Sequence, residues 1–300
     1  MTWEVVARKD FQDAVRSHWL WALSALFVTV LALPPALVIA DVIQVGGGDG
    51  LTTDLFVFLM RDTMTLLVPI IAVVLAYASI TGERDSGTLK LLLSLPHSRR
   101  DVVAGKALGR GAVIVLPVLA GFVVAAVVFL ATPVSLNAGP FFAFAALSAL
   151  IGIVFVAISV GVSAGSGSSR ASMIGAVGVY VVFTLFWNQF TNGAVRLLND
   201  YAGVGGASRV KLHLFLKVLN PTQAYKTLVA RLFTDGAVPA RVNLVGGSGL
   251  QGQLNAQLYA QALGDSVPFY LSDPFVALVL LGWLVAAPAV GYYVFRDADL

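Results

Sequence analysis

The residues with the clearest chemical pattern lie in one stretch, TGERDSGTLKLLLSLPHSRRDVVAGK, at positions 81–106. Charged side chains at both ends enclose a run of leucines, and uncharged segments flank the whole stretch. Carboxylates and basic groups form ion pairs, while clustered leucines need an apolar surface to cover them. The pattern therefore indicates a binding surface, whose partner is either another part of this chain or a separate soluble subunit.

The local sequence predicts a helix, a break and a second helix within this stretch. Ser86 and Gly87 permit a bend, and the leucine-rich run TLKLLLSL that follows predicts a short helix. Pro96 should end that helix. Ser98, followed three residues later by Asp101, forms a capping box that should start the next helix.

Catalytic and metal-binding patterns have little support elsewhere in the chain. No cysteine is present, which excludes disulfides, thiolate zinc sites and iron–sulfur ligation. His18, His97 and His213 are far apart in sequence, and no G-x-S-x-G elbow occurs. Gly247-x-Gly249-x-x-Gly252 superficially fits a dinucleotide motif, but we interpret it as a flexible turn. Since no G-x-x-x-x-G-K-[ST] motif occurs, the chain should not bind ATP itself.

The composition is that of a membrane protein. Of 300 residues, 58% are hydrophobic and 12% charged, with a mean hydropathy of +0.86, whereas a soluble domain has roughly 25% charged residues. The net charge is only +3, and the basic residues do not form a tract with interleaved aromatics. Nucleic-acid binding is therefore not expected.

Uncharged runs predict a single all-α integral membrane domain over residues 1–300, with six transmembrane helices. About 20 apolar residues cross a bilayer of about 30 Å. The spans predicted in this way are 19–40, 63–82, 111–131, 141–163, 171–191 and 274–295. They leave an interfacial helix at 1–18, a cytoplasmic loop at 83–110 and a long outer loop at 192–273.

The distribution of basic residues predicts the orientation. Lysines and arginines concentrate before the first span and in the loop at 83–110, whereas the short loops on the other side hold only Arg61. Basic residues favour the cytoplasmic side, so both termini should be cytoplasmic in a multi-pass protein of the cell membrane. The first apolar run is too long for a cleaved signal peptide.

The amino-terminal segment is amphipathic. Trp3, Ala7 and Phe11 fall on one helical face, while Arg8 and Lys9 fall on the other. We expect this helix to lie flat on the inner leaflet of the bilayer.

The outer loop should contain a helix of its own. Asn220 is a predicted N-cap, Pro221 occupies the first helical position, and Tyr225 lies on the apolar face. This helix either covers exposed span ends or gates a path, and periodicity leaves residues 210–219 open between strand and helix. Within the fourth span, Gly161-x-x-x-Gly165 predicts close helix packing, within one subunit or across a dimer.

With the spans assigned, the loop resembles the first cytoplasmic loop of ABC-2 type transporter permeases. That family's pattern is an acidic and basic pair, Gly-Thr-Leu, a leucine run, Ser-x-Pro-x-Ser-Arg and a downstream lysine. The residues that match are Glu83, Arg84, Gly87, Thr88, Leu89, Leu92, Leu93, Ser94, Pro96, Ser98, Arg99 and Lys106. Within the family, the sequence looks most like the permeases of nitrous-oxide-reductase maturation systems.

The resemblance implies that this loop is a coupling helix that docks on a separate ATP-binding-cassette ATPase subunit. Glu83 and Arg84 would then form ion pairs at the ATPase interface, and Leu89 and Leu92 would insert into its groove. It also implies a second permease copy, identical or a sister subunit, and export as the direction. ATP and Mg would bind to the partner, and this chain would hold no cofactor. The long outer loop departs from compact family members, so the substrate cannot be carried over.

Two other classes of function stay open at this point. An ion-coupled secondary transporter commonly places acidic or histidine residues inside its spans, and the six predicted spans have none between their bracketing charges. A polytopic membrane enzyme is less favoured, since no nucleophile motif is present.

Overall fold

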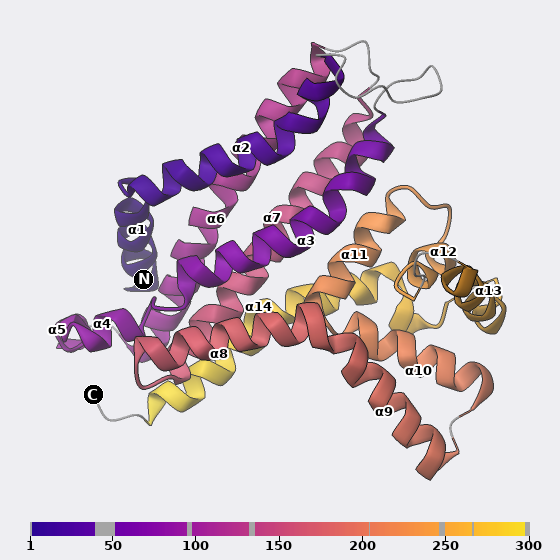
Figure 1. Cartoon of the computed structure of the whole chain (residues 1–300). Coiled ribbons are helices and arrows are strands. Elements are labelled where there is room, and N and C mark those ends of the chain that lie inside the picture. Colours follow the sequence, from indigo (N-terminus) through magenta and orange to yellow (C-terminus); the bar gives the residue numbers. More distant parts are fainter. Residues whose placement is uncertain are drawn as a thin grey trace. The chain divides into compact units, whose positions relative to one another are not determined.

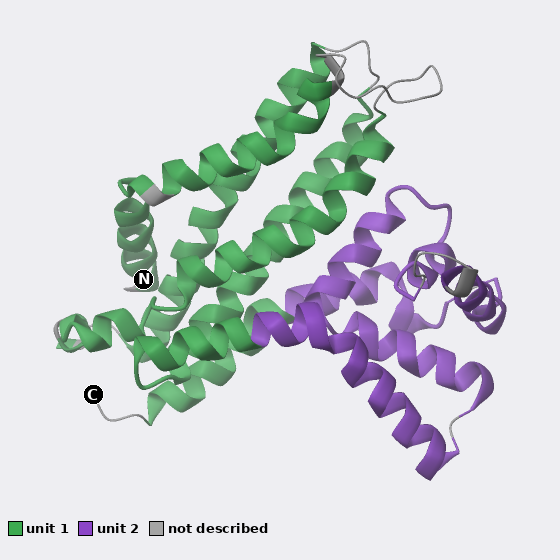
Figure 2. Cartoon of the chain, in the orientation of Figure 1, with its two compact units in different colours: residues 1–178, 283–300 green, residues 179–282 purple. Residues whose placement is uncertain are grey.

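The computed structural model describes residues 2–39, 52–94, 98–131, 136–203, 205–245, 250–265 and 267–297. All regular structure in these ranges is helical (Figure 1). The chain forms two compact units, one of residues 1–178 with 283–300 and the other of residues 179–282 (Figure 2).

The first unit holds the amino-terminal helices and the end of the last helix. Its elements are α1 (Thr2–Val15), α2 (His18–Ile39), α3 (Thr53–Ala76), α4 (Thr81–Asp85), α5 (Thr88–Ser94), α6 (Arg99–Leu130), α7 (Ala138–Gly165), most of α8 (Ser169–Val181) and the carboxyl-terminal part of α14 (Asp273–Arg296).

The second unit continues from α8 through a π-helix, η1 (Val182–Phe186). Its further elements are α9 (Trp187–Ala202), α10 (Gly206–Val218), α11 (Pro221–Arg231), α12 (Ala237–Val242), α13 (Leu250–Leu263), the short 3₁₀-helix η2 (Phe269–Leu271) and the start of α14.

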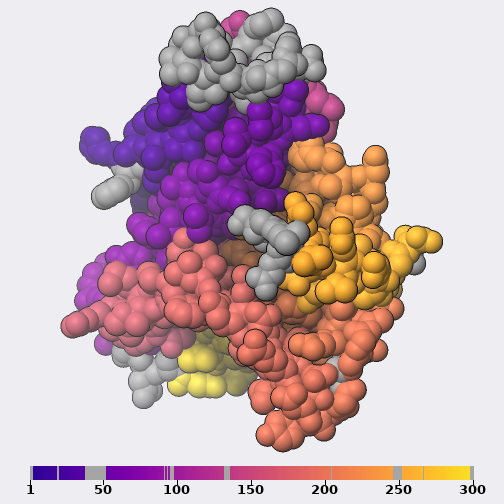
Figure 3. Space-filling model, turned by 45° about the vertical axis from the view of Figure 1, so that its right-hand side comes forward, coloured from indigo at the N-terminus to yellow at the C-terminus, as the bar shows by residue number. Residues whose placement is uncertain are grey.

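Within the described residues, six helical stretches are long and apolar enough to cross a membrane, which confirms the predicted all-α class with six spans. They correspond to α2, the α3–α4 run, α6, α7, the α8–α9 run and α14. The amino-terminal elements, drawn in indigo and purple, form part of the surface seen in Figure 3. Several large apolar side chains of α3 are exposed, among them Phe58, Leu66 and Val74. Such a surface suits contact with lipid.

The helices extend beyond several predicted spans. α3 begins at Thr53 and so includes Arg61 and Asp62, which bounded the second predicted span. The Thr52 hydroxyl accepts a hydrogen bond from Leu55 N at 3.3 Å and caps this earlier start. A charged pair limits hydropathy without ending a helix, because its side chains can point away from the apolar face.

An aromatic cluster packs α3, α6 and α7 together. The ring centroids of Phe56 and Phe129 are 5.1 Å apart, and those of Phe122 and Phe144 are 5.3 Å apart, both edge to face. Phe141 lies among them and is fully buried. Edge-to-face pairs add about 0.5–1.5 kcal/mol each beyond area burial.

Glycines set the closest helix crossings in the first unit. A Cβ added at Gly105 or Gly109 of α6 would overlap the backbone of α1, and one at Gly121 would overlap the Phe27 carbonyl of α2. A Cβ added at Gly161 of α7 would overlap the Ala287 carbonyl of α14, and one added at Gly291 of α14 would overlap the Gly161 carbonyl. The close packing predicted at Gly161-x-x-x-Gly165 therefore occurs within one subunit.

In the second unit, the predicted start of the outer helix is confirmed. Asn220 Oδ1 accepts a hydrogen bond from Thr222 N at 2.8 Å, and Pro221 is the first residue of α11. Asn220 Nδ2 also donates to Phe183 O at 2.6 Å, a carbonyl of the π-helix. One side chain thus caps α11 and satisfies a carbonyl in the irregular turn. Tyr225 is fully buried on α11.

Residues 210–219, which periodicity left open, lie almost entirely in α10. Lys217 of this helix donates to Asn188 Oδ1 and to Leu244 O, each at 2.9 Å. Burial and the positive charge of Lys226 lower the pKa of Lys217 to about 8. Burial, aided by the charges of Lys217 and Arg209, lowers the pKa of His213 to about 4. At neutral pH, His213 is therefore uncharged, whereas Lys217 stays mostly protonated and its ammonium group is held by these two acceptors.

Candidate functional site

Helices α4 and α5 carry the predicted coupling segment, and they lie at the same end of the first unit as α1 (Figure 1). Gly87 joins them with φ at +75°, a left-handed conformation that glycine adopts readily. Ser86 Oγ lies 2.9 Å from Thr88 Oγ1, which closes the turn. The predicted bend at Ser86 and Gly87 is therefore present.

The next helix begins as the sequence predicts. Asp101 N donates to Ser98 Oγ at 3.1 Å, and Ser98 N donates to Asp101 Oδ2 at 3.1 Å, which is a reciprocal capping box. Arg99 Nη1 then donates to Arg296 O at 2.9 Å, and its guanidinium lies over the ring of Phe295. Arg99 thus binds the carbonyl end of α14, where a positive charge is favourable. Pro96, the predicted end of the short helix, lies outside the described residues.

Behind the segment, four charged residues from three helices form a partly buried group that we call the inner charge cluster. Its members are Asp10 of α1, Glu83 of α4, and Lys106 and Arg110 of α6. Lys106 Nζ lies 2.6 Å from Glu83 Oε1 and 3.0 Å from Asp10 Oδ1. Arg110 Nε lies 2.9 Å from Asp10 Oδ2, although the two atoms are not aligned as a hydrogen bond. The cluster joins α1 and α4 to α6.

The burial of two members sets the energetic cost of breaking the ion pairs of this cluster. The side chains of Asp10 and Lys106 are 3% and 8% exposed. Charges removed from water to this extent are costly unless each finds a partner, and breaking such a pair costs more than breaking a surface pair. The inner charge cluster should therefore hold α4 in a fixed position against α1 and α6.

Asp10 is the functional residue that the sequence reasoning missed. It follows Trp3 and Ala7 at helical spacing and so falls on the apolar face of α1, where a carboxylate needs a buried cation. That face packs on α6 in the structure, with Val6 buried against Gly105. The expected position of α1 on the inner leaflet stays a prediction.

The remaining charges of α4 also bind within the chain. Arg84 Nη1 donates to Ser166 O at 2.9 Å, and Asp85 Oδ2 accepts from Ser169 N at 3.0 Å. The backbone nitrogen of Thr81 donates to Ser163 Oγ at 3.2 Å. These bonds join α4 to the turn between α7 and α8. Glu83 and Arg84, expected at a partner interface, thus make contacts inside this subunit.

The leucines of α5 differ in exposure. Leu89 is only 1% exposed and is buried within the chain, whereas Leu92 is half-buried. Thr88, Lys90 and Ser94 are exposed around it. The side chain of Leu93 lies outside the described part of the structure. Of the two leucines expected to insert into a partner, Leu92 is therefore the better placed.

The chain is similar to known proteins over almost its whole length. A family model described as "ABC-2 family transporter protein" matches residues 4–300. Two curated relatives carry the name "Probable ABC transporter permease protein NosY". The protein from Pseudomonas aeruginosa is 30% identical over 295 residues, and the protein from Stutzerimonas stutzeri is 31% identical over 297 residues. Each alignment covers 97% of this chain and 96% of the relative.

Proposed function

This chain belongs to the ABC-2 transporter family, and from that premise we propose that it is the permease subunit of an exporter driven by a separate ATP-binding-cassette ATPase. The observation that carries the ATPase proposal is that α4 is bonded to neighbouring helices while α5, the next helix, has an exposed surface. Helix α4, bonded to its neighbours, presents the short helix α5, on which Thr88, Lys90 and Ser94 are exposed and Leu92 is half-buried.

The contacts of α4 supply a route by which docking could move the spans. A force applied to α5 passes through Gly87 to α4, which is bonded to α6 by Glu83 and Lys106. It is also bonded to the α7–α8 turn by Arg84 and Asp85. Packed helices transmit such displacements as rigid elements rather than absorbing them. Movement of α5 should therefore shift the ends of α6 and α7 together.

The remaining parts of the proposal concern partners. The chain carries no phosphate-binding loop motif, so ATP and Mg would bind on the ATPase subunit. A second permease, identical or a sister subunit, would complete the path, with both termini of this chain cytoplasmic in the cell membrane. We also retain a role in nitrous-oxide-reductase maturation as the finer proposal. An ion-coupled transporter and a membrane enzyme remain the alternatives.

An affinity pull-down tests the ATPase proposal. The tagged chain is purified from mild detergent, with the proteins that come with it identified by mass spectrometry, and then compared with its Leu92→Asp variant. An aspartate set against an apolar groove costs a few kcal/mol, so recovery of the ATPase should fall at least about tenfold. The matched control is Leu258→Asp, the same change at an exposed leucine of α13.

The outcomes separate clearly. A soluble partner with a phosphate-loop motif that is lost in Leu92→Asp but kept in Leu258→Asp supports docking through α5. Equal recovery in both variants would remove the docking role from Leu92. If no such protein co-purifies with the folded wild-type chain, the result would favour an ion-coupled transporter.

A further inference from the structure

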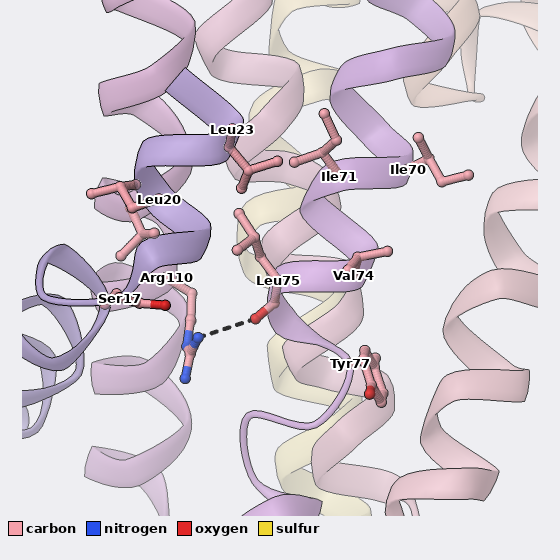
Figure 4. A pocket seen from close by; sticks show the side chains of 11 residues that line it. Ser17, Leu20, Leu23, Ile70, Ile71, Val74, Leu75, Tyr77 and Arg110 are labelled. Carbon is pink, nitrogen blue, oxygen red and sulfur yellow. Dashed lines mark hydrogen bonds between the residues drawn. The ribbon is translucent and has the colours of Figure 1, made fainter. Parts of the chain in front are cut away.

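A pocket of about 420 Å³ lies between α2 and α3, beside the inner charge cluster (Figure 4). Leu20 and Leu23 of α2 line one wall, and Ile71 and Leu75 of α3 point toward them from the other. Arg110 of α6 reaches in from behind. The volume falls within the roughly 300–1,000 Å³ of small-ligand sites.

The lining of this pocket changes character along its length. In Figure 4, Leu23 and Ile71 point toward each other at one end of the pocket, while the polar side chains of Ser17, Arg110 and Tyr77 lie nearer the other end. Both α2 and α3 are long and apolar enough to cross a membrane. The polar end of the pocket lies near Ser17, where α1 joins α2, and near Tyr77, directly after the last residue of α3. The pocket therefore runs from hydrocarbon depth to the level of lipid headgroups.

Arg110 has hydrogen-bonding capacity left for a ligand. Its Nη1 donates to Leu75 O at 3.3 Å, and its Nε faces Asp10. No acceptor among the described residues bonds the other amino nitrogen, Nη2. A guanidinium offers several donors in a planar fork that fits the oxygens of a phosphate group. A phosphate on Nη2 leaves the contacts with Leu75 and Asp10 in place.

We propose that this pocket binds one phospholipid, with its phosphate on Arg110 and an acyl chain between α2 and α3. Charge complementarity at the polar end and the apolar walls together select a molecule with an anionic group and a long tail. Val74 is 59% exposed, so the pocket is open to lipid from the side of α3. The bound lipid would share Arg110 with Asp10 and so contact the inner charge cluster.

Native mass spectrometry of the detergent-purified chain tests this proposal, with phosphatidylglycerol as the added probe. Val74→Trp places a bulky ring at the exposed edge of the pocket and should lower the lipid-bound fraction roughly tenfold, the effect of about 1.4 kcal/mol. Arg110→Gln should lower it similarly. The matched control is Val123→Trp, at a 63% exposed position on α6 outside the pocket, which should bind lipid as the wild type does.

Three results would overturn the proposal. The first is unchanged lipid binding by folded Val74→Trp. The second is displacement of the lipid by inorganic phosphate alone. The third is a dimer of this chain that Val74→Trp disrupts while no lipid is bound. If Arg110→Gln fails to fold because Asp10 loses a partner, Val74→Trp decides alone. The measurement needs no ATPase, so its result is independent of the proposed coupling.

Discussion

At the scale of single residues, the charged groups of the coupling segment act mainly inside the subunit. Glu83 and Arg84 resemble partner contacts when read in sequence, yet each has a defined bond to another helix or turn of this chain. Lys106 stands at the centre, since two carboxylates from two helices share its ammonium group. We infer that the segment's charges hold α4 in place and that its apolar and exposed residues are left for a partner.

Replacing Lys106 with methionine tests the importance of the inner charge cluster. The change leaves Asp10 buried without its ammonium partner, and breaking a buried pair costs about 3–5 kcal/mol. We expect a clear fall in the midpoint of thermal unfolding in detergent, followed by fluorescence-detected size exclusion. Lys90→Met, at an exposed lysine of α5, should change the midpoint little.

A double-mutant cycle gives the sharper result. Asp10→Asn should destabilise the wild type more than it destabilises Lys106→Met, because in that variant the Asp10 carboxylate has already lost its ammonium partner. Additive effects of the two changes would contradict direct coupling between Asp10 and Lys106.

The members of this cluster were only partly predictable from the sequence. Glu83 and Lys106 stand out because they bracket the leucine run, but 96 residues separate Asp10 from Lys106. No local period links residues so far apart, and only the packing of α1 on α6 brings them together. The carboxylate on the apolar face of α1 was the available signal.

At the scale of elements, the helix starts with a recognised capping motif were predicted well, whereas the start of α3 and several helix ends were not. The caps at Ser98 and Asn220 depend on residues within a few positions, and both are present. The fifth span was expected to end at residue 191, whereas helix continues through η1 to Ala202. A π-helix there has no sequence signal of its own, because its freed carbonyl is satisfied by Asn220, a residue 37 positions away.

The crossing of α7 and α14 offers a test of helix packing. A methyl group at Gly161 would overlap the backbone of Ala287, so Gly161→Ala should destabilise the chain by about 1–3 kcal/mol. The matched control is Gly178→Ala, since a Cβ at Gly178 of α8 meets nothing within 4 Å. That change should be neutral or stabilising by up to about 1 kcal/mol, because alanine favours helix. Equal unfolding midpoints for both variants in detergent would exclude a tight crossing.

At the scale of the whole molecule, the six spans and their charge distribution predict which parts face the proposed ATPase. The membrane class of the protein could be predicted from composition, because uncharged runs of this length are typical of transmembrane helices. The division into two compact units did not, since both α8 and α14 run continuously across the boundary. Hydropathy reports that a helix is apolar, and it carries no information on which neighbours that helix contacts.

The absence of native cysteines makes the predicted orientation directly measurable, because a single introduced cysteine is the only thiol in the chain. Basic residues concentrate around α5 and before α2, so the positive-inside rule places α5 in the cytoplasm and α13 outside. Gln253→Cys on α13 should therefore react with a membrane-impermeant maleimide on intact cells, whereas Lys90→Cys on α5 should react only after permeabilisation. Both positions are exposed, and labelling in detergent controls for reactivity. Labelling of Lys90→Cys on intact cells would invert the topology and place α5 out of reach of any cytoplasmic ATPase.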